Sequence, residues 1–260
     1  MFFGFKKKNN SSSSTPVKTE TTTSTNSSAK VVLSKAEDGL ERHIVRLKKE
    51  KNIDLSSHRA RVFVVIDRSG SMTSLYQSGE IQNVLTRLLP LALKFDDNGE
   101  LEVYVFNTSC IQMPSMNLSN YESYVKREIM NKGYGPSGGT SYSPVIEKTM
   151  SIYDDGSSYP AFGIFITDGE NDDAYATDRA IRNSSKLKIF YQFVGIGSEN
   201  FRYLQKLDDL DGRDVDNTTF IKVSDFARLD DEQLYAKLLE QYPQWLRAMQ
   251  ILDNFINLKS

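Results

Sequence analysis

The stretch RVFVVIDRSGSM, residues 61–72, decides the fold class of this chain. Its first half is a short apolar run, rich in β-branched residues, that ends on Asp67. A continuous run of this kind is typical of a strand that is covered on both faces in a parallel sheet. Ser69 and Ser71 follow at alternate positions. The stretch therefore predicts a buried strand that delivers an acid and two hydroxyls to the loop after it.

The same alternation of strands and helices continues along the chain. Further strands are predicted at 101–107, 161–168, 188–197 and 219–223, with an edge hairpin near 111–113. Apolar residues at helical spacing predict helices around 81–95, 121–130 and 144–153. This order predicts an α/β fold: a doubly wound, mostly parallel sheet with one antiparallel edge strand and helices on both faces.

The two ends of the chain differ from this middle. Residues 10–28 are almost entirely Ser, Thr and Asn, so we expect residues 1–32 to form a disordered tail. A capping box of Ser34 and Glu37 opens a helix, and residues 33–58 are expected to form this helix and a linker. The main domain should cover 59–258 and end in a helix with Trp245 and Ile256 on one face.

Composition excludes several classes of function. The formal net charge is only -2, so no global field favours nucleic acid. Cys110 is the single cysteine, which rules out an internal disulfide. No apolar run approaches the ~20 residues that span a bilayer, so no stable membrane insertion is expected. These features predict a monomeric, cytoplasmic protein without a nucleic-acid partner.

Two acids end predicted strands, Asp67 and Asp168, and parallel strands bring their carboxyl ends to one edge of the sheet. Ser69, Ser71 and, in the glycine-rich loop, Thr140 add three hydroxyls. Carboxylates and hydroxyls are hard oxygen ligands that suit Mg²⁺. The alternative is that both acids merely cap the helices that follow them.

The order DRSGSM, GGTSY and ITDG resembles the metal-ion-dependent adhesion site of von Willebrand factor type A domains. The pattern of that site, D-x-S-x-S followed by a Thr and an Asp, is matched at five positions: Asp67, Ser69, Ser71, Thr140 and Asp168. The resemblance implies a Rossmann-like sheet with Mg²⁺ or Mn²⁺ at its top. It also implies a protein partner that offers a carboxylate to the ion.

A narrower resemblance covers most of residues 60–250, including KFDDNGELEVYVFN, ITDGEND and FYQFVGIG. These segments are similar to the type A domain of TerF-like tellurium-resistance proteins. The resemblance implies a bacterial, cytoplasmic role in a stress-response system. It does not imply a calcium role, because a Ser/Thr/Asn tail stands where family members commonly carry a calcium-binding module.

Enzymatic interpretations find less support in the sequence. A metal-dependent phosphohydrolase is the alternative function, but such enzymes place a second Asp where this chain has Ser69. No G-x-S-x-G elbow surrounds Ser69 or Ser71. His43 and His58 precede the first strand and are expected to be solvated. Asp172 and Asp173 are expected in a solvated loop and helix start, or as supporting carboxylates. We therefore expect no enzymatic activity.

Overall fold

A six-stranded sheet forms the centre of the computed structural model, which describes residues 1, 22–169, 171–197, 199–223 and 229–251. The strands lie in the order β3-β2-β1-β4-β5-β6. All neighbouring pairs are parallel except β2 and β3, which are antiparallel. The strands are β1 Arg61–Asp67, β2 Glu102–Phe106, β3 Cys110–Gln112, β4 Ala161–Thr167, β5 Ile189–Ile196 and β6 Thr218–Val223.

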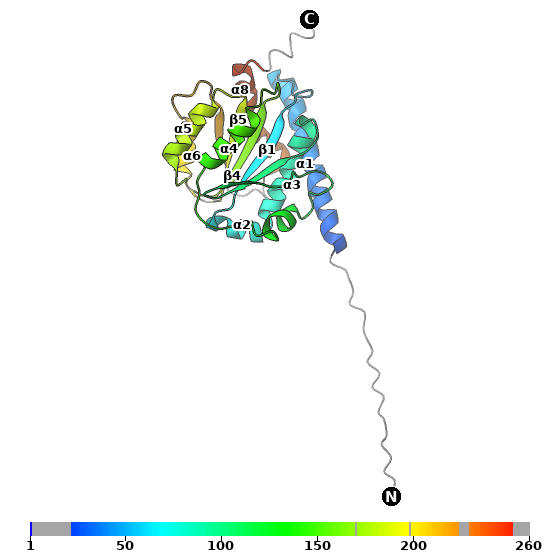
Figure 1. The fold of residues 1–260 in the computed structure, drawn as a ribbon. Helices are drawn as coiled ribbons and strands as arrows, with labels where there is room; N and C mark the ends of the chain where they lie inside the picture. Colours follow the sequence, from blue (N-terminus) through cyan, green and yellow to red (C-terminus); the bar gives the residue numbers. More distant parts are fainter. Residues whose placement is uncertain (2–21, 170, 198, 224–228, 252–260) are drawn as a thin grey trace.

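Helices cover both faces of this sheet (Figure 1). One face carries α4 Ser143–Tyr153, α5 Ala174–Ser184 and α6 Arg202–Asp208. The other carries α3 Glu80–Phe95, α7 Asp231–Leu238 and α8 Tyr242–Ala248, with α1 Thr22–Lys51 packed against α3 and α7. The short elements η1 Gly70–Met72 and α2 Thr73–Gln77 follow β1, and a π-helical turn, η2, spans Val125–Met130. The predicted fold class is confirmed.

The central strand β1 shows why the chain folds in this way. Its residues alternate between two hydrophobic clusters, with Val62, Val64 and Ile66 facing α3 and with Phe63 and Val65 facing α4. A strand that packs on both faces must be apolar throughout, which is what the opening stretch of sequence predicts.

The order of the strands reverses at one position in the sheet, between β1 and β4. From β1 the chain builds outward through β2 and β3, and it then returns to β4 on the other side of β1. The carboxyl ends of β1 and β4 therefore flank the point where strand order reverses. Open α/β sheets bind their ligands at such a point. Asp67 ends β1, and Asp168 follows β4 directly.

The first helix begins earlier than the sequence indicated. α1 starts at Thr22, twelve residues before the predicted start at Ser34. Ser and Thr cost only a few tenths of a kcal/mol each in a helix, so a helix that is nucleated by packing can extend through them. The expected disordered tail, residues 1–32, thus overlaps α1 from Thr22 onward. Residues 2–21 lie outside the described residues.

Two further expectations, on the C-terminal helix and on the two histidines, are corrected by the structure. The C-terminal helix α8 ends at Ala248, and Ile256 lies outside the described residues. His43 and His58, which were expected to be solvated, are buried. His58 lies between Phe95 and Tyr242 and shares a 2.9 Å hydrogen bond with the Tyr242 hydroxyl. His43 occupies the apolar stripe of α1, beside Ile44.

No helix among the described residues is long and apolar enough to cross a membrane. α1 has the length for a span, but its sequence is predominantly polar and charged.

Candidate functional site

Asp67 lies at the centre of the site and is fully buried. Its Oδ1 accepts a 2.6 Å hydrogen bond from the backbone amide of Ser69. Its Oδ2 accepts a 2.6 Å bond from the hydroxyl of Thr167, the last residue of β4. The parallel register pairs Ile66 with Ile166, which brings Thr167 beside Asp67. Both carboxylate oxygens are therefore fixed in direction.

A chain of hydroxyls links the two predicted acids. The Ser69 and Ser71 hydroxyl oxygens lie 3.0 Å apart. The Ser71 hydroxyl donates a 2.8 Å hydrogen bond to Asp168 Oδ1. The loop after β1 and the acid after β4 are thus joined through side chains alone, although they are separated by almost one hundred residues.

Thr140 reaches the same place from a third loop. The position that a Cβ atom would take on Gly169 lies 3.6 Å from Thr140 Oγ1, 3.8 Å from Asp67 Oδ2 and 3.9 Å from Ser71 Oγ. Three oxygens, two from the end of β1 and the loop after it and one from the glycine-rich loop, therefore lie within 4 Å of one point. Because residue 169 is a glycine, it places no side chain in the space beside these oxygens.

Backbone contacts hold the glycine-rich loop against the loop after β1. The Ser137 amide donates to the Arg68 carbonyl at 2.6 Å, and the Gly70 amide donates to the Gly138 carbonyl at 3.2 Å. Gly138 adopts a φ of +78°, which a side chain would strain. The Asn107 side chain donates to the Ser137 carbonyl at 2.9 Å. These bonds fix the position of the segment that leads to Thr140.

Asp172 and Asp173 anchor the other end of this segment. Asp172 Oδ2 accepts from the Thr140 amide at 2.8 Å, and the Asp172 amide donates to the Thr140 carbonyl at 2.7 Å. Asp173 accepts from the Ser143 amide and hydroxyl. Burial alone would raise the pKa of Asp173, but these and further hydrogen bonds outweigh it, and the pKa is lowered. Asp172 supports Thr140 directly, and Asp173 holds Ser143 just after it, so they are not merely solvated loop residues.

Burial also controls the charge of the two central acids. It raises the pKa of Asp67 to about 6, although hydrogen bonds from Thr167 and Ser69 act in the opposite direction. Burial raises the pKa of Asp168 as well, against the hydrogen bond from Ser71. A buried carboxylate without a counter-charge is costly, and a nearby cation favours its ionised form. The electrostatics of the site therefore favour a positively charged ligand.

The site opens into a cleft of about 480 Å³. Ser71, Thr140 and Asp168 lie on its wall together with Asp172 and the apolar side chain of Leu75. The other lining residues come from α2, from the end of β5 and from the loops after β4 and β5: Ser74, Gly169, Ile196, Gly197 and Glu199. A ligand in this cleft can contact the oxygens described above and an apolar surface next to them.

The donor set fits a hard cation. Two carboxylates and three hydroxyls supply only oxygen, as Mg²⁺ and Mn²⁺ prefer. Within the described ranges, no three His, Cys, Asp or Glu side chains gather closely enough to hold a metal. A cation at this site would therefore need the hydroxyls of Ser69, Ser71 and Thr140 as well as the two carboxylates.

Sequence reasoning missed Thr167, and it left the supporting role of Asp172 as one of two alternatives. Thr167 belongs to an apolar strand, and its only signal is its place immediately before Asp168. Its role depends on the register between β1 and β4, which the sequence does not specify. Tyr76, whose hydroxyl donates to the Asp67 carbonyl at 3.1 Å, was also missed, because its contact depends on how α2 packs against the end of β1.

Comparisons with known proteins agree with this architecture. The family model of the von Willebrand factor type A domain found at the C terminus of TerF matches residues 59–252. The uncharacterized protein YcbR of Bacillus subtilis (strain 168) is 38% identical over 211 residues, which are 80% of this chain and 86% of that protein.

Solved structures share the fold at low sequence identity. The manganese-loaded TRAP protein of Plasmodium vivax is 14% identical with a TM-score of 0.53, covering 72% of this chain and 74% of that one. An aerotolerance-related membrane protein from Bacteroides fragilis NCTC 9343 is 16% identical with a TM-score of 0.51, covering 71% and 98%. The strand order, the family match and the similarity to YcbR lead to one conclusion. The chain belongs to the family of von Willebrand factor type A domains that includes the C-terminal domain of TerF.

Proposed function

We propose that this domain binds Mg²⁺ or Mn²⁺ through five residues and uses the ion to hold a protein partner. The ligands are the side chains predicted from the sequence: Asp67, Ser69, Ser71, Thr140 and Asp168. The observation that carries the proposal is the convergence of Thr140 Oγ1, Asp67 Oδ2 and Ser71 Oγ on one point beside Gly169. When bound, the ion supplies a positive charge that can accept a carboxylate from the partner.

The chain's own residues prepare this site in the absence of a partner. Thr167 and the Ser69 amide fix the Asp67 carboxylate, and Ser71 holds Asp168. Asp172 holds the backbone of Thr140. Because these contacts fix the ligands in advance, little ordering entropy opposes the binding of an ion.

Binding is better supported than turnover. A hydrolase needs a general base or acid near its nucleophile, and the histidines are placed elsewhere. His43 lies on α1, and His58 packs between Phe95 and Tyr242. The apolar side chain of Leu75 in the cleft also suits a protein surface. We therefore propose a binding module that has no enzymatic activity.

The biological setting that we propose rests on the family resemblance. TerF-type domains suggest a stress-response or tellurium-resistance assembly, and the composition suggests the cytoplasm and a monomer. The fold relative TRAP is described as manganese-loaded, so Mn²⁺ belongs in every test beside Mg²⁺. The partner is a protein that presents an acidic side chain.

The test is an affinity capture from cell extract with the wild-type protein and Asp67→Asn. A partner that depends on the ion binds wild type in Mg²⁺, and it is lost both in chelator and in the variant. The exposed acid Asp211 supplies a matched control, Asp211→Asn, which should retain the partner. A partner captured equally in chelator and by Asp67→Asn would contradict the proposal and indicate a scaffold that does not use the site.

The phosphohydrolase alternative has its own test. The protein is incubated with Mg²⁺ or Mn²⁺ and p-nitrophenyl phosphate. The binding proposal expects no turnover above that of Asp67→Asn. Turnover that disappears in this variant would replace the binding proposal with the enzymatic one.

A further inference from the structure

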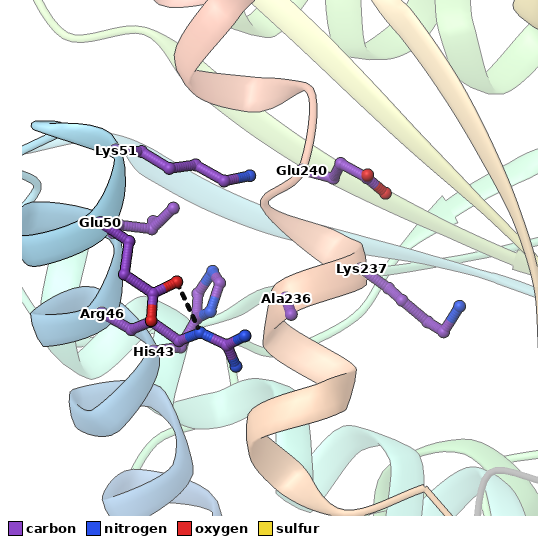
Figure 2. A pocket seen from close by; sticks show the side chains of 8 residues that line it. His43, Arg46, Glu50, Lys51, Ala236, Lys237 and Glu240 are labelled. Carbon is purple, nitrogen blue, oxygen red and sulfur yellow. Dashed lines mark hydrogen bonds and ion pairs between the residues drawn. The ribbon is translucent and has the colours of Figure 1, made fainter.

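His43 is a buried histidine for which the proposed function has no use. Its side chain lies between α1 and α7, in the wall of a pocket of about 200 Å³ (Figure 2). The residue is 5% exposed. Nδ1 and Nε2 are both shielded from solvent, and neither has a hydrogen-bond partner. A buried polar group without a partner is unusual in a native protein and calls for an explanation.

Charged side chains surround this ring, most of them already engaged. On α1, Arg46 pairs with Glu50 at 3.1 Å. Arg46 also reaches Glu232 of α7 at 3.3 Å, and Arg42 pairs with the same glutamate. The pocket is further lined by Lys51, Lys237 and Glu240. From α3, Lys94 pairs with Glu41 and Arg87 pairs with Asp231.

The neutral form of His43 suits this environment, and the charged form does not. Burial lowers the pKa of the imidazole. Glu232 acts in the opposite direction, but the charges of Arg46 and Lys51 add to the effect of burial. A proton would place a positive charge in the helix interface, where neither ring nitrogen has a hydrogen-bond acceptor, and such a charge is unfavourable.

We propose that His43 makes the attachment of α1 to α7 sensitive to protons, so that protonation of its ring loosens the C-terminal half of α1 from the domain. The neutral ring packs in the helix interface, and the protonated ring is stable only when it reaches water. Acidification therefore shifts the equilibrium toward a state in which α1 has moved away. This property goes beyond the proposed metal-dependent binding and does not depend on it.

The sign and size of the effect follow from proton linkage. His43 binds a proton more weakly in the packed state than in the open state, where its pKa is about 6.5. The open state therefore gains population as the pH falls below about 6.5. At pH 5 the equilibrium constant for opening can rise by up to about 30-fold over its value at pH 8, for a single proton.

The contact between α1 and α7 joins the N-terminal helix to the type A domain. The family match begins at residue 59, and α1 ends at Lys51. α1 thus lies outside the residues that the family model matches, and it covers α3 and α7. Its loosening would expose its own buried residues Leu40, Ile44 and Leu47, together with the surfaces of α3 and α7 that α1 covers.

Residue-level hydrogen exchange of the full chain tests the proposal. Amide protection of residues 40–51 is measured at pH 5, 6, 7 and 8 and corrected for intrinsic exchange. We expect the opening constant of this segment to rise from pH 8 to pH 5, by up to about 30-fold, while amides of β1 and β4 remain protected. In His43→Leu, which keeps the packing but cannot be protonated, the rise should disappear.

The titration of the ring itself, followed by NMR in the wild-type protein, gives a second measurement that needs no variant. The proposal requires the His43 ring in the folded protein to titrate below the pKa of about 6.5 that a free imidazole has. A ring that titrates at 6.5 or above would overturn it. So would a pH dependence of exchange in residues 40–51 that is the same in wild type and in His43→Leu.

Discussion

The Thr167 hydroxyl donates a 2.6 Å hydrogen bond to Asp67 Oδ2 across two neighbouring parallel strands. Neither residue is exposed to solvent. The bond directs one carboxylate oxygen, and the Ser69 amide directs the other. Thr167 is not one of the five proposed metal ligands, yet it helps to position Asp67, the most buried acid of the site.

Removing this hydroxyl should destabilise the fold. Thr167→Val keeps the shape of the side chain but leaves a buried carboxylate with one partner fewer. A hydrogen bond to a charged group contributes about 1.5–3 kcal/mol, and we expect a loss of that order. Urea denaturation at pH 7.5 measures it. Thr219→Val, in β6 of the same sheet, is the control and should change the free energy of unfolding by less than about 1 kcal/mol.

Gly163 allows β1 and β4 to pack around an aromatic ring. A Cβ at this position would lie 2.2 Å from the Phe63 ring. Phe63 stacks on Tyr153, which limits its freedom to move away. We expect Gly163→Ala to cost at least about 1–3 kcal/mol, as overpacked core positions do.

A second substitution checks this explanation. In Phe63→Leu the ring atoms that meet the new methyl group are absent, so Gly163→Ala should cost much less in that background. Denaturation of the two single variants and the double variant gives the coupling energy. Additive effects would show that the cost has another origin.

His58 should make global stability depend on pH. Burial lowers the pKa of His58 to about 4. The unfolded chain takes up a proton as the pH falls through about 6.5, and the folded chain does so only near 4. The stabilisation is therefore complete above pH 6.5 and is lost as the pH falls toward 4, by at most about 3 kcal/mol.

His58→Gln removes this titration and keeps a polar group next to the Tyr242 hydroxyl. The slope of unfolding free energy against pH between 4.5 and 6.5 should be shallower in the variant than in wild type. Because other groups titrate in the same range, the difference between the two proteins is the quantity to compare. Equal slopes would mean that His58 is protonated without cost in the folded state.

Gly169→Ala places a methyl group among the oxygens of the site. The new Cβ would lie 3.6–3.9 Å from three of them, which is ordinary contact. The fold should therefore tolerate the change, with a loss below about 1 kcal/mol. The response to Mg²⁺ or Mn²⁺ should weaken, because the methyl group occupies the space between the ligands. Thermal melts with and without ion separate these two effects.

The fold followed from local patterns for physical reasons. The strands of this sheet are buried on both faces, so they read as continuous apolar runs, and the acids after β1 and β4 fall at their ends. The antiparallel edge strand β3 was also predicted from its short distance to β2. The sequence could predict that Asp67 and Asp168 lie close together, because neighbouring parallel strands have their carboxyl ends at the same edge of the sheet.

What the sequence did not reveal depends on contacts between distant segments. Thr167 acquires its role from the register of β1 against β4. The start of α1 at Thr22 depends on extension of a helix that is stabilised by packing farther along. The burial of His43 could have been recognised, because it falls beside Leu40, Ile44 and Leu47 on the apolar stripe of the helix.

The measurement that most directly tests the account is the thermal stability of the protein at increasing Mg²⁺ or Mn²⁺, with chelator as reference. An ion that binds the folded state raises Tm, by an amount equivalent to about 2.7 kcal/mol at one hundred times its dissociation constant. We predict this rise in wild type and in Asp211→Asn. In Asp67→Asn and in Thr140→Ala it should be small or absent. A wild-type Tm that does not respond to saturating ion, or a rise that persists in both site variants, would contradict the assignment of these residues as metal ligands.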